Sequence, residues 1–170
     1  MSNIYQIFNG PSPTTAAQVP VTTGTAIKTL LQVLPSATNT IRVIEWGISF
    51  DGSAAGTPIK CELLETDVAA TVTAHVAAGI VKFGGTALSN GDVTTNLIQV
   101  GTSATGYTST SEGSITTTRV FDAQLVAPTN QYVKQFPLGR EPVIQVSKYL
   151  RIRVTAGTAV NAYCYVTIEL

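Results

Sequence analysis

Apolar and polar residues alternate along most of this chain, which is the pattern of β-strands that bury one face. Residues 40–50, TIRVIEWGISF, place Trp46 and Ile48 on one side and Glu45 on the solvent side. Residues 58–66, PIKCELLET, alternate in the same way, and the glycine-rich DGSAAG between the two runs is a turn signal. We therefore expect these two runs to form a β-hairpin.

The last part of the chain keeps this alternation up to its final residue. Apolar residues stand at even positions both in 149–154 and in 160–170. A hairpin that keeps both sets on one face needs a loop of odd length, and Ala156-Gly157-Thr158 supplies one with a glycine for the left-handed position. This register predicts Arg151 opposite Tyr163 on the outer face of the sheet.

Two segments fit both a helix and a strand by periodicity. Residues 26–34 carry apolar side chains at both spacings, and the strands that follow favour a strand. Residues 67–78 have a valine at every fourth position, with Asp67 and Gly79 in the places of helix caps. The same segment also alternates with threonine, so a short helix and a strand both stay open for it.

The N-terminal region is rich in proline and poor in apolar residues. Residues 9–25, NGPSPTTAAQVPVTTGT, contain three prolines, so they cannot form a central strand. We expect residues 1–25 to form an extended arm and residues 26–170 to form one β-sandwich domain. The arm is either a loose tail or a segment laid over a neighbouring subunit.

The whole pattern is that of an all-β protein. Residues 101–118, GTSATGYTSTSEGSITTT, are mostly glycine, serine and threonine, and they predict a long mobile loop whose end enters a strand. With about eight to ten short strands, the chain predicts an antiparallel β-sandwich of the jelly-roll type. An immunoglobulin-like sandwich is the alternative, but its Cys…Trp…Cys spacing is missing.

Charge is sparse and balanced, with ten basic and ten acidic residues and a charged fraction of 12%. Average soluble domains have about 25%, and a neutral surface is a poor design for a free monomer. This favours a surface covered by other subunits, although threonine, serine, asparagine and glutamine can also hydrate a monomer. Scattered basic residues argue against nucleic acid as a partner.

The ends and cysteines of the chain bear on its location. No run of about 18 apolar residues predicts a membrane span, and no basic segment followed by an apolar core predicts a secretory signal. We therefore expect assembly in a cytoplasm. Cys61 and Cys164 stand at apolar positions of expected strands, where buried free thiols are the simplest interpretation.

No catalytic, cofactor or metal site is expected. His75 is the only histidine, and no nucleophile turn lies near it in sequence, so a solvated or hydrogen-bonded histidine is favoured over a catalytic one. Glu62 and Glu65 fall on opposite sides of a strand, while Asp67 and Asp92 stand in turn contexts where aspartate caps the chain. No pair of carboxylates is placed in one cleft, as a glycosidase would need.

Aromatic residues are the better candidates for function, because tyrosine buries area while keeping a polar tip. Tyr107 lies in the expected loop, and Tyr163 and Tyr165 lie on the outer face of the last strand, near Tyr149 and Arg151. These five residues are the predicted interface. The alternative is a cross-strand ladder with no partner.

Two stretches, IEWGISFDGSAAGTPIKCELLETDVAATVT and APTNQYVKQFPLGREPVIQ, occur in this order. They resemble small β-sandwich proteins encoded among the head genes of tailed bacteriophages, over Ala26 to Leu170 and without the arm. The resemblance implies capsid decoration, also called cement, by an oligomer, often a trimer, that bridges neighbouring major capsid subunits. It supplies no catalytic or contact residues to transfer.

The expected function is therefore that of a structural virion protein that self-associates, as a trimer, and docks on the lattice of the major capsid protein. The alternative is a tail-associated carbohydrate- or receptor-binding module that uses the 101–118 loop and Tyr107. The fold alone does not separate the two. An enzyme ranks third and would depend on His75.

Overall fold

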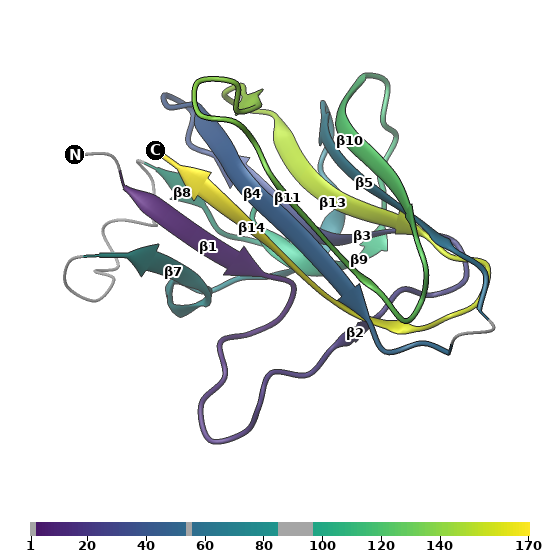
Figure 1. Cartoon of the computed structure of the whole chain (residues 1–170). Helices are drawn as coiled ribbons and strands as arrows, with labels where there is room; N and C mark the ends of the chain where they lie inside the picture. The colour runs from purple at the N-terminus through teal and green to yellow at the C-terminus, as the bar shows by residue number, and fades with distance from the viewer. Residues whose placement is uncertain (1–2, 54–55, 85–96) are drawn as a thin grey trace.

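The chain folds into two antiparallel β-sheets that stack face to face (Figure 1). The computed structural model describes residues 3–53, 56–84 and 97–170. In spatial order, sheet A contains β11 (Gln131–Gln135), β4 (Ile41–Phe50), β14 (Asn161–Glu169), β1 (Ile4–Phe8) and β7 (Ile80–Phe83), with β2 (Val21–Thr22) on β14 and β12 (Val143–Ile144) on β4.

Sheet B covers the other side of the core and carries the remaining strands. Its order is β10 (Thr118–Val126), β5 (Ile59–Thr66), β13 (Tyr149–Thr155), β3 (Ile27–Pro35), β9 (Gly106–Ser111) and β6 (Thr71–Ala74), with β8 (Ile98–Gln99) on β3. The antiparallel β-sandwich predicted from the alternation is therefore confirmed. The jelly-roll assignment stays a prediction.

The core lies between the two sheets and is built from one side of each strand. In sheet A, Trp46, Val166 and Ile7 stand in one row across β4, β14 and β1, and each is at most 1% exposed. In sheet B, Leu63 and Ile152 form the matching row. Burying such side chains stabilises the fold by roughly 1.5–3 kcal/mol each, so the alternation of the sequence is the main determinant of the sandwich.

Both predicted hairpins are wrong. β4 and β5 belong to different sheets, as do β13 and β14, so each connection crosses from one sheet to the other. Alternation specifies which side of a strand faces the core, and two facing sheets satisfy it as well as one hairpin does. Consequently Arg151 does not lie opposite Tyr163; the register partner of Tyr163 is Ser49.

The two ambiguous segments form mainly extended structure. The strand favoured for residues 26–34 is confirmed as β3. Residues 67–78 contain β6, and the only helical part nearby in the described chain is the three-residue 3₁₀ turn Ala77–Gly79. No helix in the described ranges has the length and apolar character needed to cross a membrane.

The N-terminal arm is not confirmed over its full length. β1 is an inner strand of sheet A, paired with β14 and β7, and its Tyr5 and Ile7 are fully buried. The proline-containing connection 9–20 instead leaves the sandwich as a projecting loop before β2 (Figure 1). The predicted loop 101–118 is also partly wrong, because residues 106–111 form β9.

Candidate interaction surface

The outer face of sheet A carries a row of apolar and aromatic side chains. Register partners place Phe8 of β1 beside Tyr165 of β14, Tyr165 beside Gly47 of β4, and Gly47 beside Val133 of β11. Phe8, Tyr165 and Val133 point away from the core, because they alternate with residues that face it. Val133 is 52% exposed, so this row reaches the surface at the edge strand β11.

Gly47 allows Tyr165 to pack closely on the sheet. A Cβ atom added at Gly47 would lie 2.5 Å from Cε1 of Tyr165, so any larger residue would push the ring away. The Tyr165 hydroxyl donates a hydrogen bond to Glu45. The centroids of the Phe8 and Tyr165 rings lie 5.8 Å apart. Burial, followed by the bond to Glu45, raises the pKa of Tyr165 to about 12.

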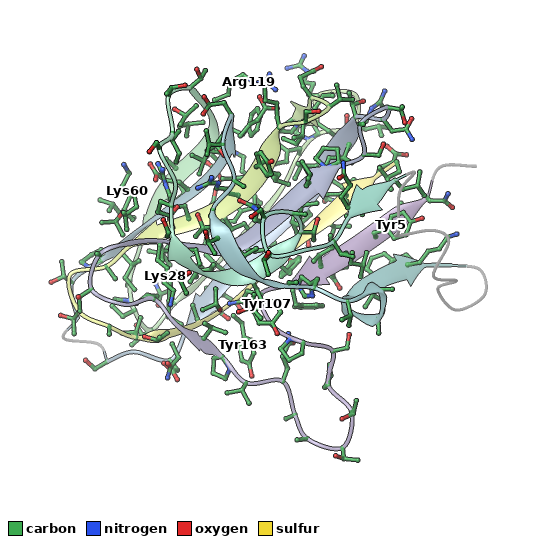
Figure 2. The ribbon with its side chains drawn as sticks, turned by 180° about the vertical axis from the view of Figure 1, so that it is seen from behind. Tyr5, Lys28, Lys60, Tyr107, Arg119 and Tyr163 are labelled. Carbon is green, nitrogen blue, oxygen red and sulfur yellow. The ribbon has the colours of Figure 1, made fainter. Side chains whose placement is uncertain are left out.

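A groove runs along this face where the 9–20 connection returns to the sheet. The hydroxyl of Tyr163 donates to the backbone carbonyl of Gln18, which fixes the end of the connection against β14 (Figure 2). The groove has a volume of about 370 Å³. The lining side chains that matter here are aromatic or uncharged: Phe8, Ala17, Gln131, Val133, Tyr163 and Tyr165.

The outer face of sheet A has few charges over its central part. Glu45 is hydrogen-bonded to Tyr165, and Arg42 and Glu169 pair in register at one end of the sheet. The other outward positions on β1, β4, β11 and β14 hold uncharged residues: Gln6, Phe8, Gly47, Ser49, Gln131, Val133, Gln135, Tyr163, Tyr165 and Thr167. A face of this composition resembles the core of a protein interface.

The outer face of sheet B is different, because it carries paired charges. Glu62 accepts from Lys60 of its own strand at 2.8 Å and from Arg153 of the neighbouring β13 at 2.9 Å. Burial raises the pKa of Glu62, but its hydrogen bonds and the two cations outweigh this and leave the pKa below its ordinary value. These charges satisfy one another within the chain.

Arg151 is fully buried on this face, although its position in the strand points outward. Its guanidinium lies 3.0 Å from Oε2 of Glu112 and donates to the carbonyls of Glu112 and Val68. Glu112 also accepts from the backbone N–H and hydroxyl of Thr29 and from Ser109. The segment around Glu112 therefore covers the strand, and the prediction that Arg151 lies on an open outer face is wrong.

The five predicted interface residues do not form one surface. Only Tyr163 and Tyr165 share a strand and a groove, whereas Tyr149 and Arg151 lie in sheet B. Tyr107 lies on β9 and packs on the ring of His75 at 4.8 Å. The part of the 101–118 loop that carries Tyr107, which the alternative function would use for ligand binding, is thus a strand.

His75 is buried and hydrogen-bonded, not solvated. It is 2% exposed, and its Nε2 lies 2.7 Å from the carbonyl oxygen of Phe8, which links the segment after β6 of sheet B to the end of β1 of sheet A. Burial lowers the pKa of His75 despite that hydrogen bond. A Cβ atom at Gly79 would lie 2.4 Å from its Nδ1, so the ring is tightly enclosed.

The acidic residues are also bound in structural contacts. A bulge in β10 turns Asp122 into the space between the sheets, where Trp46 Nε1 (3.1 Å), the Tyr132 hydroxyl (2.9 Å) and Lys134 Nζ (3.2 Å) surround it. Glu65 pairs with Arg119, separately from Glu62.

Asp67 accepts hydrogen bonds from the backbone N–H groups of Thr116 and Thr117 and from the Thr116 hydroxyl. These bonds, that of the Thr116 hydroxyl first, lower the pKa of Asp67 to about 2. Asp92 lies outside the described residues. No group of three metal-ligating side chains occurs within ranges 3–53, 56–84 and 97–170. Cys61 and Cys164 are buried free thiols, as expected.

Sequence reasoning missed three parts of the surface: Phe8, Gly47 and the backbone of Gln18. Phe8 had a signal, since IYQIF at residues 4–8 alternates like the other strands. Gly47 and Gln18 had none, because their roles depend on partners more than 100 positions away. Comparison of the chain with protein-family models, curated proteins and solved structures found no match.

Proposed function

We propose that this chain is a structural virion protein that decorates the capsid: it self-associates, as a trimer, and binds the lattice of the major capsid protein. The observation that carries the proposal is the aromatic, sparsely charged outer face of sheet A. A face that combines half-buried Phe8, Tyr163 and Tyr165 with exposed Val133, around a groove lined by no charged side chain, favours a protein partner. The resemblance to phage head proteins supplies the class of that partner.

The physics of a shell suits a chain of this kind. A capsid repeats the same surface many times, so a modest contact per subunit becomes strong when one oligomer binds several sites at once. Low surface charge also reduces repulsion between copies that are packed side by side. On this proposal the protein is assembled in the host cytoplasm and ends on the virion surface.

Co-sedimentation tests the proposal with capsid shells assembled from the major capsid protein of the same genome. We expect the chain to pellet with the shells and to saturate at a fixed ratio to the lattice sites. Val133→Asp, on the outer face of sheet A, should weaken pelleting at least tenfold. Leu125→Asp is the matched control, because Leu125 is 74% exposed on sheet B. A chain that stays in the supernatant at all shell concentrations would overturn the proposal.

The alternative of a carbohydrate-binding module loses its first candidate contact, since Tyr107 packs on His75. The groove beside Tyr163 and Tyr165 is the remaining place where a sugar ring could stack. A glycan array separates the two functions: specific hits that vanish in Tyr165→Ala would favour the module. An array without hits, together with saturable shell binding, supports decoration.

A further inference from the structure

We infer that the groove on the outer face of sheet A binds the 9–20 connection of a second copy of this chain. The inference deepens the proposed function, on which it rests for the existence of self-association, by assigning the self-contact to this groove. Self-association and shell binding are read out by different experiments, so the two proposals can be tested separately.

The groove provides an uncharged aromatic floor. Its lining includes Phe8 and Tyr165, whose rings lie side by side, and Val133, which is separated from Tyr165 by Gly47. Tyr163 also lines the groove and bonds to the connection at Gln18. Its volume of about 370 Å³ falls within the range of ordinary binding pockets, roughly 300–1,000 Å³. Aromatic grooves of this kind recognise proline-containing extended segments, which lose little entropy on binding.

The chain itself contains a segment of matching chemistry. Residues 11–20, PSPTTAAQVP, hold three prolines and no charged residue. Its tip, residues 13–17, is exposed throughout, and Val19 is 70% exposed. Burying a charged segment in such a groove would cost the free energy of desolvating its charges, whereas this segment has no charge to desolvate. Groove and segment are both uncharged, so the segment can enter the groove without desolvating a charge.

The connection is held at both ends, which presents the tip as a preformed loop. At its start, the Asn9 side chain donates to the carbonyl of Ala162 at 3.0 Å and accepts from the N–H of Cys164 at 2.9 Å. At its end, the Gln18 carbonyl accepts from Tyr163. Fixing the two ends reduces the entropy that binding must overcome.

The position of the loop favours a second copy as the occupant. Ala17 and Gln18 belong to the connection and also line the groove, so tip and groove are neighbours on one molecule. Figure 1 shows the remainder of the loop leaving the sandwich. When two copies meet at this place, the tip of each can enter the groove of the other or of the next, which closes a small symmetric ring.

Mixed cysteine cross-linking tests this contact on the full chain. Thr15→Cys marks the tip and Gln131→Cys marks the exposed rim of the groove, while Cys61 and Cys164 are buried. An equal mixture of the two variants, one of them isotope-labelled, is oxidised and analysed by mass spectrometry. We expect a disulfide between position 15 of one copy and position 131 of the other.

Thr15→Cys mixed with Ala123→Cys is the matched control, because Ala123 is exposed on sheet B. Cross-linking to position 123 as efficient as to position 131 would overturn the inference, and so would the absence of any 15–131 product. A second variant tests the contact without relying on the geometry of a disulfide. Ala16→Asp should weaken self-association at least tenfold, and Ala123→Asp should leave it unchanged.

The two proposals fail in different ways. An oligomer that forms the 15–131 cross-link but does not pellet with shells supports this contact and overturns capsid decoration. An oligomer that survives Ala16→Asp and lacks the cross-link overturns this contact, even if it binds shells. A monomer at every concentration overturns the contact outright.

Discussion

The outer faces of the two sheets differ in whether their outward side chains find partners within the chain. On the central strands of sheet B, the outward charged residues are paired with one another or covered, as Arg151 is by the segment around Glu112, and exposed apolar residues such as Leu125 lie on the edge strand β10. On sheet A, most outward residues are aromatic or uncharged, and among the described residues the groove beside Tyr165 is covered only by the root of the 9–20 connection. A face that satisfies itself needs no partner, whereas exposed apolar area favours one.

The difference also has an energetic side. The ion pairs of sheet B stabilise the monomer by specifying where a distant segment packs, at the cost of desolvating Arg151. The apolar side chains of sheet A contribute roughly 25 cal/mol for each Å² that a partner removes from water. The first face therefore matters for folding and the second for association, and the predictions below separate the two.

The largest effect on stability is expected for Arg151→Met. Removing the buried guanidinium leaves the carbonyls of Val68 and Glu112 unpaired and the Glu112 carboxylate without its cation, so unfolding should become easier by about 3 kcal/mol. Urea unfolding at pH 7 measures this. Arg140→Met, on an exposed turn, is the control, with a change within about 0.5 kcal/mol. A loss below about 1 kcal/mol at Arg151 would show that the cover of sheet B is dispensable.

Gly47→Ala tests the packing of sheet A. Its Cβ would collide with the Tyr165 ring at 2.5 Å, and moving that ring should cost about 1–2 kcal/mol and disturb the groove. Chemical denaturation gives the stability, and shell binding reports on the groove. Gly157→Ala is the matched control, because nothing lies within 4 Å of its Cβ. Equal stability and binding in both variants would contradict the role of Gly47.

The stability that Glu112 and Tyr165 contribute to the two faces should be lost at opposite ends of the pH scale. The pKa of Glu112 is lowered from its ordinary 4.5, since its hydrogen bonds and Arg151 outweigh burial; its stabilisation is present above pH 4.5 and lost as pH falls through the lowered value. The pKa of Tyr165 is raised from 10.0 to about 12, so its stabilisation is present below pH 10 and lost as pH rises toward 12.

Unfolding free energies measured across pH for two variants check this prediction. Glu112→Gln should flatten the acid limb only. Tyr165→Phe should flatten part of the alkaline limb, where Tyr132 also titrates near 12. An acid limb unchanged by Glu112→Gln would assign the loss of stability to other carboxylates.

The smallest effect is expected for Lys60→Ala. Its side chain is 53% exposed, and Glu62 keeps Arg153 as a partner. Surface ion pairs of this type contribute about 0–1 kcal/mol, so the unfolding free energy should fall by no more than about 0.5 kcal/mol. Thermal or urea unfolding measures this, and a loss above about 1 kcal/mol would mean that the charges of sheet B act as one network.

The sequence was sufficient for the fold class and for the inward side of most strands. Leu150, Ile152 and Cys164 are buried as their alternation predicts, because a period of two leaves no other way to remove them from water. It was insufficient for pairing. Alternation does not say whether the next strand lies beside a strand or across the core, and both hairpins failed for that reason.

The candidate site was predictable only in part. Arg151 and Tyr163 both point outward by parity, and what separates them is a cover supplied by Glu112, 39 positions away from Arg151. β1 was missed although it alternates, since its partner β14 lies at the other end of the chain. Local patterns therefore predict which residues leave the core, and only tertiary contacts decide which of them stay accessible.

The central claim is that the outer face of sheet A is the docking surface of this protein. Sedimentation-velocity molar masses of the wild-type chain, Val133→Asp and Leu125→Asp test it most directly. The account predicts a wild-type species about three times the chain mass of 17.8 kDa, its loss in Val133→Asp and its retention in Leu125→Asp. A wild-type monomer, or an oligomer that Val133→Asp leaves intact, would contradict it.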